Sequence, residues 1–431
     1  DICQLNDGGF LIISNKYNPH YVFILHVNKF GGVLDSNSLS LTNCVTCVPT
    51  NDNCCMIIGY EYPPSASVFA AKINSTGQIV WKKNYDSTGA TECEKIIRTT
   101  DNKYLCCGRT NYWYGFAMKI DENGNLLWKK TYPVSFIKEY KWVCESNVSG
   151  YVLAGIILDS ATSPAQGIIT KIDTSGNIFW ERRYKEVIFT INKITTNYLL
   201  SIYYPDTISY QADHTGMIKI DESGNILTKK IYFSPGYELE NQDCKVINPN
   251  KYLFLNYRQK LPNDTSSAYA FFTDSSGSVL RTYIYGGFDY SILNKAIITS
   301  DGGFAFAGSC NNITPHVNSA FIVRTDSNLY APPVGIFGSG QQILNSYTLV
   351  NVYPNPFNSQ LKISMNISKT GYYQLVLYDI LGKEIQTILR ETIVAGAYKK
   401  IVNMNNYPSG IYFLKFHGEK INICQKIVFI K

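Results

Sequence analysis

The stretch Lys119-Ile-Asp-Glu-Asn-Gly-Asn-Leu-Leu-Trp-Lys-Lys130 decides the fold of this 431-residue chain, because the chain contains it repeatedly. Close copies begin at Lys72, Lys171 and Lys219, and three weaker copies retain only the turn. An Asn or Asp leads each of the seven turns: Asn28, Asn74, Asp121, Asp173, Asp221, Asp274 and Asp326. These residues are 46 to 53 positions apart, and such a period is typical of repeat architectures.

A second signature recurs with the same period. Its clear copies begin at Asp7, Asp101, Ser149, Asn250 and Asp301, and two poorer copies lie near Asp52 and Thr196. In the third unit the two signatures separate four short apolar stretches, residues 94–100, 104–110, 115–120 and 125–132. Each unit is therefore predicted to contain four short strands joined by tight turns.

The turn residues and the composition both favour β-structure. In Asp-x-x-Gly, the Asp side chain accepts hydrogen bonds from the following backbone amides, and Gly allows a positive φ. The 33 Tyr and 21 Phe residues suit half-buried strands. A four-stranded unit cannot bury both of its faces alone. Seven such units predict an all-β protein, a seven-bladed β-propeller with blades packed face to face around a channel.

The repeats also set the predicted domain boundaries. The propeller spans residues 1–331, with blades at about 1–43, 44–90, 91–138, 139–187, 188–236, 237–289 and 290–331. Pro and Gly residues after Tyr330 predict a linker over 332–346. Short alternating strands with turns at Pro354-Asn-Pro356 and Pro408-Ser-Gly410 then predict a small β-sandwich over 347–431.

The way the ring closes follows from the strand order. Blade one begins on its innermost strand and blade seven ends on its outermost, so no strand crosses between blades to close the ring. Of the 12 Cys residues, Cys3 and Cys310 are predicted to face each other across this seam and to form a disulfide. Cys44-Val-Thr-Cys47 has the spacing of a metal site but lacks a second ligand pair, which favours a disulfide or buried thiols.

No catalytic, metal or cofactor site is predicted. The five His residues are scattered, and the recognisable acidic residues mostly occupy the repeated turns. Five further carboxylates fall near the starts of innermost strands: Glu92, Glu94, Glu139, Glu238 and Glu240. We interpret them as solvated charges at the mouth of the channel rather than as a catalytic pair.

Aromatic residues supply the remaining candidates for ligand contact. Tyr112, Trp113 and Tyr114 form a compact group between two strands, where side chains of this kind can stack on a sugar or anchor a protein. Loops that break the repeat are predicted at 60–67, 203–215 and 260–267. Trp81, Trp128 and Trp180 recur inside the repeat and are interpreted as packing residues.

Charge and hydropathy exclude two classes of function. The net charge of +6 is spread along the chain without a basic block, so no nucleic-acid partner is predicted. No apolar run approaches the ~18 residues that would predict a transmembrane segment. The chain begins at Asp1 without a basic and apolar leader, which suggests a mature form that has lost a signal peptide.

Five short motifs follow one another near the C-terminus. They are Tyr353-Pro-Asn-Pro-Phe357, Tyr373-Gln-Leu-Val-Leu-Tyr-Asp379, Leu381-Gly-Lys-Glu384, Pro408-Ser-Gly-Ile-Tyr-Phe413 and Lys426-Ile-Val-Phe-Ile-Lys431. This order resembles the type A C-terminal sorting domain of the type IX secretion system of Bacteroidota. The repeats before it are similar to the short propeller repeats of exported bacterial proteins that precede such domains.

The resemblance implies an address and a partner. A domain of this family is recognised by the outer-membrane translocon and is commonly removed, which places the protein outside the cell or on the outer-membrane surface. The motif residues that would carry its fold and recognition are Asn355, Pro356, Phe357, Gly382, Lys383, Gly410 and Tyr412. Whether the domain is cleaved or retained is open from the sequence.

Three functions are compatible with these observations. The leading hypothesis is a secreted or cell-surface, non-enzymatic propeller that binds a surface protein, a glycan or its own copies, with no cofactor. One alternative is a propeller hydrolase or lyase acting on polysaccharide at the axial face, which carboxylates clustered at one mouth would favour. Another is a subunit of an extracellular filament or sheath, in which the retained sandwich docks onto a neighbour.

Overall fold

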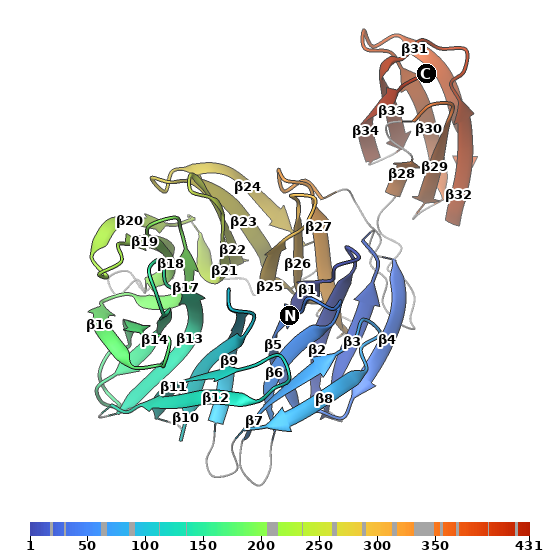
Figure 1. Cartoon of the computed structure of the whole chain (residues 1–431). Coiled ribbons are helices and arrows are strands. Elements are labelled where there is room, and N and C mark those ends of the chain that lie inside the picture. Colours follow the sequence, from blue (N-terminus) through green and yellow to red (C-terminus); the bar gives the residue numbers. More distant parts are fainter. Residues whose placement is uncertain are drawn as a thin grey trace. The chain divides into compact units, whose positions relative to one another are not determined.

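Antiparallel sheets make up all of the secondary structure in the computed structural model, which describes residues 1–431 with gaps (Figure 1). The residues outside the description are 18–19, 30–31, 62–66, 86–90, 112, 135, 205–213, 235, 261–264, 287–289, 313–316, 332–348, 354–356, 368–369, 395 and 419–420. The chain divides into two compact units, Asp1–Tyr330 and Ala331–Lys431. No helix in the described part is long and apolar enough to span a membrane.

The first four sheets each contain four strands that pair in chain order. The first two sheets comprise β1 (Ile2–Gln4), β2 (Phe10–Tyr17), β3 (His20–Val27), β4 (Val33–Leu39), β5 (Asn43–Pro49), β6 (Cys55–Glu61), β7 (Ser67–Ile73) and β8 (Ile79–Asn84). The next two comprise β9 (Thr91–Arg98), β10 (Tyr104–Thr110), β11 (Tyr114–Ile120), β12 (Leu126–Tyr132), β13 (Ile137–Glu145), β14 (Tyr151–Leu158), β15 (Gln166–Ile172) and β16 (Ile178–Tyr184).

Three more sheets complete the repeat. The fifth and sixth comprise β17 (Val187–Lys193), β18 (Tyr198–Tyr204), β19 (His214–Ile220), β20 (Ile226–Tyr232), β21 (Tyr237–Asn248), β22 (Lys251–Lys260), β23 (Ser266–Asp274) and β24 (Val279–Tyr285). The seventh has three described strands, β25 (Tyr290–Ile298), β26 (Phe304–Asn312) and β27 (Val317–Thr325). The predicted all-β fold, a seven-bladed propeller followed by a small β domain, is confirmed.

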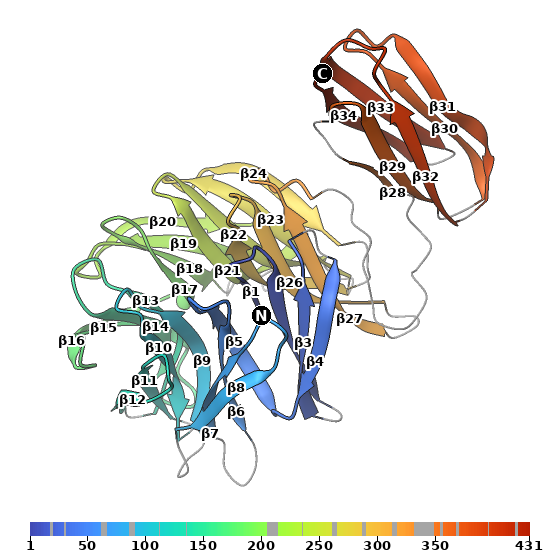
Figure 2. The same cartoon turned by 45° about the vertical axis from the view of Figure 1, so that its right-hand side comes forward.

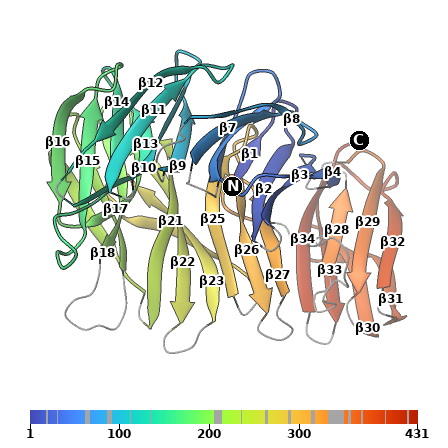
Figure 3. The ribbon, with the colours of Figure 1, turned by 90° about the horizontal axis from the view of Figure 1, so that it is seen from below.

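The innermost strands form a closed ring around the propeller axis (Figure 1). Contacts run from β1 to β5, β9, β13, β17, β21 and β25, and β25 returns to β1. Figure 3 shows β25, β26 and β27 beside the first blade. At this seam Ile2 packs with Ala305 and Ala307, and the Ser300 N–H donates to Gln4 Oε1 at 2.8 Å. In the described part, packing and side-chain bonds close the ring, and no strand crosses it.

The Asp-x-x-Gly turns form as their chemistry predicts. Asp121 Oδ1 accepts the N–H groups of Asn123 at 2.9 Å and Asn125 at 2.7 Å, while Gly124 has a φ of 73°. The same pair of bonds recurs at Asp173, Asp221, Asp274 and Asp326. In blades three to six the turn joins the third and fourth strands, and at Asp326 it follows the third strand of the seventh blade, so the repeated motif marks the same place in each of these blades.

In blades two to six, a tyrosine at or just after the end of the outermost strand bonds to the next blade. Tyr132 at the end of β12 donates its hydroxyl to the carbonyl of Gly176, in the turn of the following blade, at 2.9 Å. Four further pairs repeat this bond: Tyr85 with Gly124, Tyr184 with Gly224, Tyr232 with Gly277, and Tyr285 with Leu329. Trp81, Trp128 and Trp180 pack against the glycines of the same turns, as interpreted from the sequence.

The C-terminal unit consists of two small sheets that enclose their own core (Figure 2). One contains β28 (Leu349–Tyr353), β29 (Gln360–Ile367) and β32 (Gly396–Asn403). The other contains β30 (Gly371–Tyr378), β31 (Glu384–Ile393), β33 (Gly410–Gly418) and β34 (Ile421–Phe429). The turn before β31 copies the propeller turn, because Asp379 Oδ1 accepts the N–H groups of Leu381 and Lys383, each at 2.9 Å.

Candidate ligand site on the propeller axis

A β-bulge interrupts every innermost strand from the second blade to the seventh. The pairing of each strand with its neighbour shifts by one residue at the same place, which leaves an extra residue on the inner strand. The extra residues are Val45, Glu94, Lys141, Phe189, Gln242 and Asn294. Bulges of this kind re-aim the neighbouring side chains. The repeated bulge therefore re-aims side chains at the same level of the ring in six blades.

A glycine on the second strand makes room for the bulge. A Cβ atom added to Gly155 would lie 1.9 Å from the carbonyl oxygen of Glu139, a distance that no real Cβ contact shows. Gly59, Gly108 and Gly308 occupy the equivalent place and meet the same obstacle. Blades five and six carry Ile202 and Asn256 there, so those bulges leave space for a side chain.

The six residues that follow the bulges occupy equivalent positions and so lie at the same level of the ring. These residues are Thr46, Lys95, Trp142, Thr190, Asp243 and Lys295. The Lys95 Nζ atom lies 4.2 Å from the centre of the Trp142 ring, and the Lys295 Nζ atom lies 4.5 Å from it. Lys245, two residues beyond Asp243, lies with its Nζ 5.4 Å from the same ring. Four blades thus bring three lysines to one indole.

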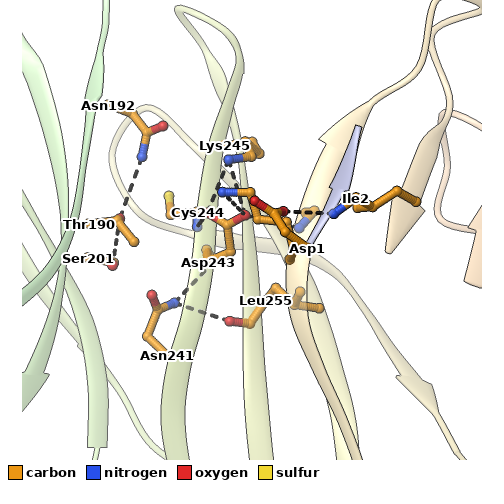
Figure 4. Close-up of polar contacts among 12 residues, drawn as sticks. Asp1, Ile2, Thr190, Asn192, Ser201, Asn241, Asp243, Cys244, Lys245 and Leu255 are labelled. Atoms are coloured by element: carbon orange, nitrogen blue, oxygen red, sulfur yellow. Dashed lines mark hydrogen bonds and ion pairs between the residues drawn. The ribbon is translucent and has the colours of Figure 1, made fainter. Parts of the chain in front are cut away.

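One carboxylate accompanies these lysines. Asp243 is fully buried and accepts the N–H groups of Cys244 at 2.9 Å and Ala296 at 3.0 Å. One of its carboxylate oxygens lies 3.1 Å from Lys245 Nζ (Figure 4). A carboxylate oxygen also lies 3.8 Å from Lys295 Nζ. Burial alone would raise the pKa of Asp243, but Lys245, Lys295 and Lys95 outweigh it and hold that pKa below its ordinary value. Asp243 is therefore ionised.

The axial cluster, defined as Lys95, Lys245, Lys295, Trp142 and Asp243, carries more positive than negative charge. Burial is the main cause that lowers the pKa of Lys95, and the neighbouring Lys295 and Lys245 lower it further. Burial also lowers the pKa of Lys245. Cation–π contact with Trp142 and the single carboxylate offset only part of this repulsion. An anion placed among the three ammonium groups would relieve it.

Carboxylates gather at the channel mouth where the innermost strands begin. Lys141 Nζ lies 2.8 Å from a Glu139 oxygen and 3.2 Å from a Glu94 oxygen, while Arg109 binds Glu92 at 2.7 Å. Burial and then the nearby Glu139 carboxylate raise the pKa of Glu94 to about 7, although Lys141 opposes them. Glu92, Glu94 and Glu139, predicted as solvated charges at the mouth, are thus bound to basic partners. The other two, Glu238 and Glu240, lie at the start of β21.

The predicted aromatic contacts lie on the rim at this same end. Trp113 is 44% exposed, and its ring lies 5.2 Å from the ring of Phe136. The carbonyl oxygen of Trp113 accepts the N–H of Lys138 in the next blade at 2.8 Å. Tyr114 is half-buried in β11, and Tyr112 lies outside the described residues. Trp113 therefore joins two blades and also presents an aromatic surface.

The predicted cysteine pair is placed with other neighbours. The Cys3 Sγ atom lies 3.1 Å from the Cys55 Sγ atom, and Cys47 completes this buried group. Cys310 is a buried residue of β26 and is not a member of the group. The structure therefore offers Cys3 a thiol neighbour within the first two blades rather than across the seam.

The sorting-motif residues that the structure describes hold the C-terminal unit together. Phe357 is buried against Phe429, and its backbone bonds to Val428 and Ile430 on either side. Tyr412 is buried and donates to the carbonyl of Pro408 at 2.7 Å. The remaining motif residues occupy two turns or lie outside the description: Gly382 and Lys383 form the turn before β31, Gly410 begins β33, and Asn355 and Pro356 are not described.

Comparisons with known proteins agree with these two units. Residues 351–431 match the family of secretion system C-terminal sorting domains. No curated protein matches the chain. Among solved structures, PorZ, an essential surface component of the type-IX secretion system of Porphyromonas gingivalis, has 9% identity and a TM-score of 0.45, with 100% of this chain and 59% of PorZ covered.

Two further solved structures, a hydrolase and the propeller domain of a protease, are similar to this chain. A puromycin hydrolase S511A mutant has 8% identity and a TM-score of 0.52, with 85% of this chain and 58% of the hydrolase covered. The β-propeller domain of the trilobed protease from Pyrococcus furiosus has 9% identity and a TM-score of 0.45, with 75% and 91% covered. The chain spans less than two thirds of PorZ and of the hydrolase.

The fold and the sorting domain together define the class of this protein as an exported β-propeller. Its C-terminal unit is a type IX secretion sorting domain, which directs export to the cell surface or outer membrane.

Proposed function

We propose that the propeller is a non-enzymatic binding module of the cell surface that holds an anionic group at its axial cluster. One observation carries the proposal: Lys95, Lys245 and Lys295 surround a single Trp142 ring with one carboxylate among them. Burial and mutual repulsion lower the pKa of Lys95, and a bound anion would favour the charged form of these lysines. A carboxylate, sulfate or phosphate group has the required negative charge.

The repeated acidic residues support binding rather than catalysis, because structural bonds occupy them. Asp101 pairs with Lys119 and also accepts the Thr99 hydroxyl, which joins the two repeated signatures within one blade. The equivalent pairs are Asp52 with Lys72 and Asp301 with Arg324. Each of these carboxylates already has charge-assisted bonds within its own blade. These groups are therefore supports of the fold.

The binding test uses the full chain at low ionic strength. Calorimetric titration with sulfate, with phosphate and with a short uronic-acid oligosaccharide separates an inorganic anion from a glycan-borne carboxylate. Lys95→Met and Lys295→Met are each expected to weaken the binding of whichever anion binds the parent protein at least tenfold. Lys185→Met, which removes an exposed lysine outside the cluster, is expected to leave binding unchanged. Equal affinities of all three variants, or no heat with any anion, would refute the proposal.

A polysaccharide hydrolase or lyase is the second candidate, and Glu94 favours it. A carboxyl group with a pKa of about 7 can donate a proton near neutral pH, and Glu139 stands beside it as a second carboxylate. Both carboxylates, however, bind the one Lys141 ammonium, which suits an ion-pair network better than a cleavage site. Release of reducing ends from acidic polysaccharides that Glu94→Gln abolishes would establish this candidate in place of the first.

A further inference from the structure

Three thiols meet where the first blade packs on the second. Cys3 lies on β1, Cys47 on β5 and Cys55 on β6, and all three are at most 5% exposed. Their Sγ atoms lie within 4.8 Å of one another, and those of Cys3 and Cys55 are 3.1 Å apart. No other cluster of this size and spacing occurs among the residues that the structure describes. Such a group can hold a soft metal ion or form a disulfide.

The surroundings of the thiols decide between these two chemistries. Leu11, Ile13, Val22, Ile24 and Phe69 belong to the same buried apolar core. A metal ion needs deprotonated thiolates, and three thiolates around a singly or doubly charged cation leave negative charge in that core. A disulfide is neutral and leaves no charge behind. The apolar core therefore favours the disulfide.

Hydrogen bonding among the sulfurs is consistent with one shared negative charge at most. Hydrogen bonds from Cys47 and Cys55 lower the pKa of the Cys3 thiol. The pKa of Cys47 is raised, first by the hydrogen bond that Cys47 makes with Cys3 and also by burial. Burial is the first cause that raises the pKa of Cys55. Cys3 is thus the sulfur best able to attack as a thiolate.

We propose that Cys3 and Cys55 form a disulfide in the exported protein, with Cys47 as the remaining buried thiol. The Cys3 and Cys55 thiols together lose two protons and two electrons as the Sγ–Sγ bond forms. A small disulfide such as oxidised glutathione, or the disulfide of a thiol oxidoreductase, accepts them and becomes two thiols. The cell-surface address of the chain is an oxidising environment in which such a bond persists.

The bond would fix the shortest of the described innermost strands. β1 is three residues long and pairs with β2 at three positions, yet it is the first blade's contribution to the ring. It contacts β5 on one side and β25 and β26 on the other. A Cys3–Cys55 bond ties β1 covalently to the second blade, so the seam between blades one and seven cannot open by detachment of β1.

Peptide mapping of the full chain tests the proposal directly. The protein, exported or refolded with oxidised and reduced glutathione, is unfolded and alkylated with iodoacetamide without a reductant, then digested. The expected product is one Cys3–Cys55 peptide pair, lighter by two hydrogens than the sum of its peptides, with Cys47 alkylated. An alkylated Cys3, a bond from Cys3 to Cys47 or Cys310, or a stoichiometric metal in the native protein would overturn it.

Variants give a second, independent measurement. In oxidising buffer, Cys3→Ala and Cys55→Ala are expected to lower the urea midpoint equally, and the double variant is expected to lower it no further. A reductant should lower the urea midpoint of the parent protein to that of the Cys3→Ala and Cys55→Ala variants. The disulfide between Cys3 and Cys55 should persist in Cys47→Ala. Additive losses in the double variant, or a parent midpoint that the reductant leaves unchanged, would contradict the bond.

Discussion

Replacement of one tyrosine should measure how strongly the blades hold one another. Tyr132 is 5% exposed, and its hydroxyl donates to the carbonyl of Gly176 in the next blade at 2.9 Å. Tyr132→Phe removes this bond and keeps the ring. The lost bond costs about 1 kcal/mol net, and the buried carbonyl left without a partner adds to this, so we expect a loss of about 2 kcal/mol in the free energy of unfolding.

The repeat allows the estimate to be tested by addition. Tyr232 donates to Gly277 two blades further along, so the two sites share no residue. Distant substitutions add, and the double variant Tyr132→Phe/Tyr232→Phe should lose about 4 kcal/mol. Urea unfolding followed by tryptophan fluorescence gives both values, provided that the m-value is unchanged.

The control is Tyr330→Phe, since Tyr330 is 57% exposed and loses only a solvated hydroxyl. We expect its effect to lie within about 0.5 kcal/mol of the parent. If Tyr132→Phe matched this control, or if the double variant lost no more than the single one, the hydroxyl bonds between blades would not contribute to stability as argued.

Three further predictions concern single positions. Lys95→Met should stabilise the propeller by about 1–3 kcal/mol, since it removes a buried charge of the same sign as its neighbours and keeps a similar volume. Because the pKa of Lys95 is lower in the folded state than in the unfolded state, the stability of the parent should rise with pH toward about 10, and the variant should lack this rise. Gly155→Ala should prevent folding or cost more than about 3 kcal/mol, since its Cβ would meet the Glu139 carbonyl at 1.9 Å, whereas Gly410→Ala, with its nearest atom at 4.0 Å, should be neutral in circular dichroism melts. Lys72 is the chief cause that lowers the pKa of Asp52 to about 2, so Asp52 should stabilise the fold fully above about pH 4 and progressively less as the pH falls through 2. In Asp52→Asn the urea midpoint should therefore change less with pH between about 4 and about 2 than it does in the parent. An equal pH dependence of the two midpoints would contradict this.

The architecture was predictable because its signals are local. Asp121 and Gly124 determine their own turn, and the same bonds form wherever the spacing recurs, including at Asp379 in the C-terminal unit. The number of turns in the sequence therefore predicted the number of hairpins, and the even spacing of the turns predicted one blade for each of them. The predicted packing role of Trp128 also needed only its place in the repeat.

The axial cluster was missed because its members share a position and not a residue type. Thr, Lys, Trp, Thr, Asp and Lys occupy the level after the bulge, so no motif emerges from a comparison of blades. A usable signal existed. Nine positions after each of Lys95, Trp142, Asp243 and Lys295 comes an aromatic residue, which is the first or second residue of the next strand. The glycine of the second signature was equally visible, but its reason, a carbonyl on the neighbouring strand, depends on pairing.

The cysteine contacts could not be derived from the sequence for a different reason. Cys3 lies 52 positions from Cys55, and which thiol it meets depends on how β1 packs on the second blade. In the described residues the ring closes without an interleaved strand, as the strand order predicted, but the strand order did not place the sulfurs. The mouth carboxylates show the same limit, since Lys141 joins Glu94 to Glu139 only through the bulges of two blades.

The uninterrupted strand order of the blades has a consequence for how such a chain can change. Each blade is one continuous segment, so duplication or deletion of a segment would add or remove a whole blade and leave every remaining hairpin intact. The turns and the tyrosine bonds would tolerate six or eight blades equally well. Lys95 and Lys295, however, reach Trp142 from blades three and seven, which requires this circumference. In this protein the axial cluster, unlike the hairpins, therefore depends on the number of blades.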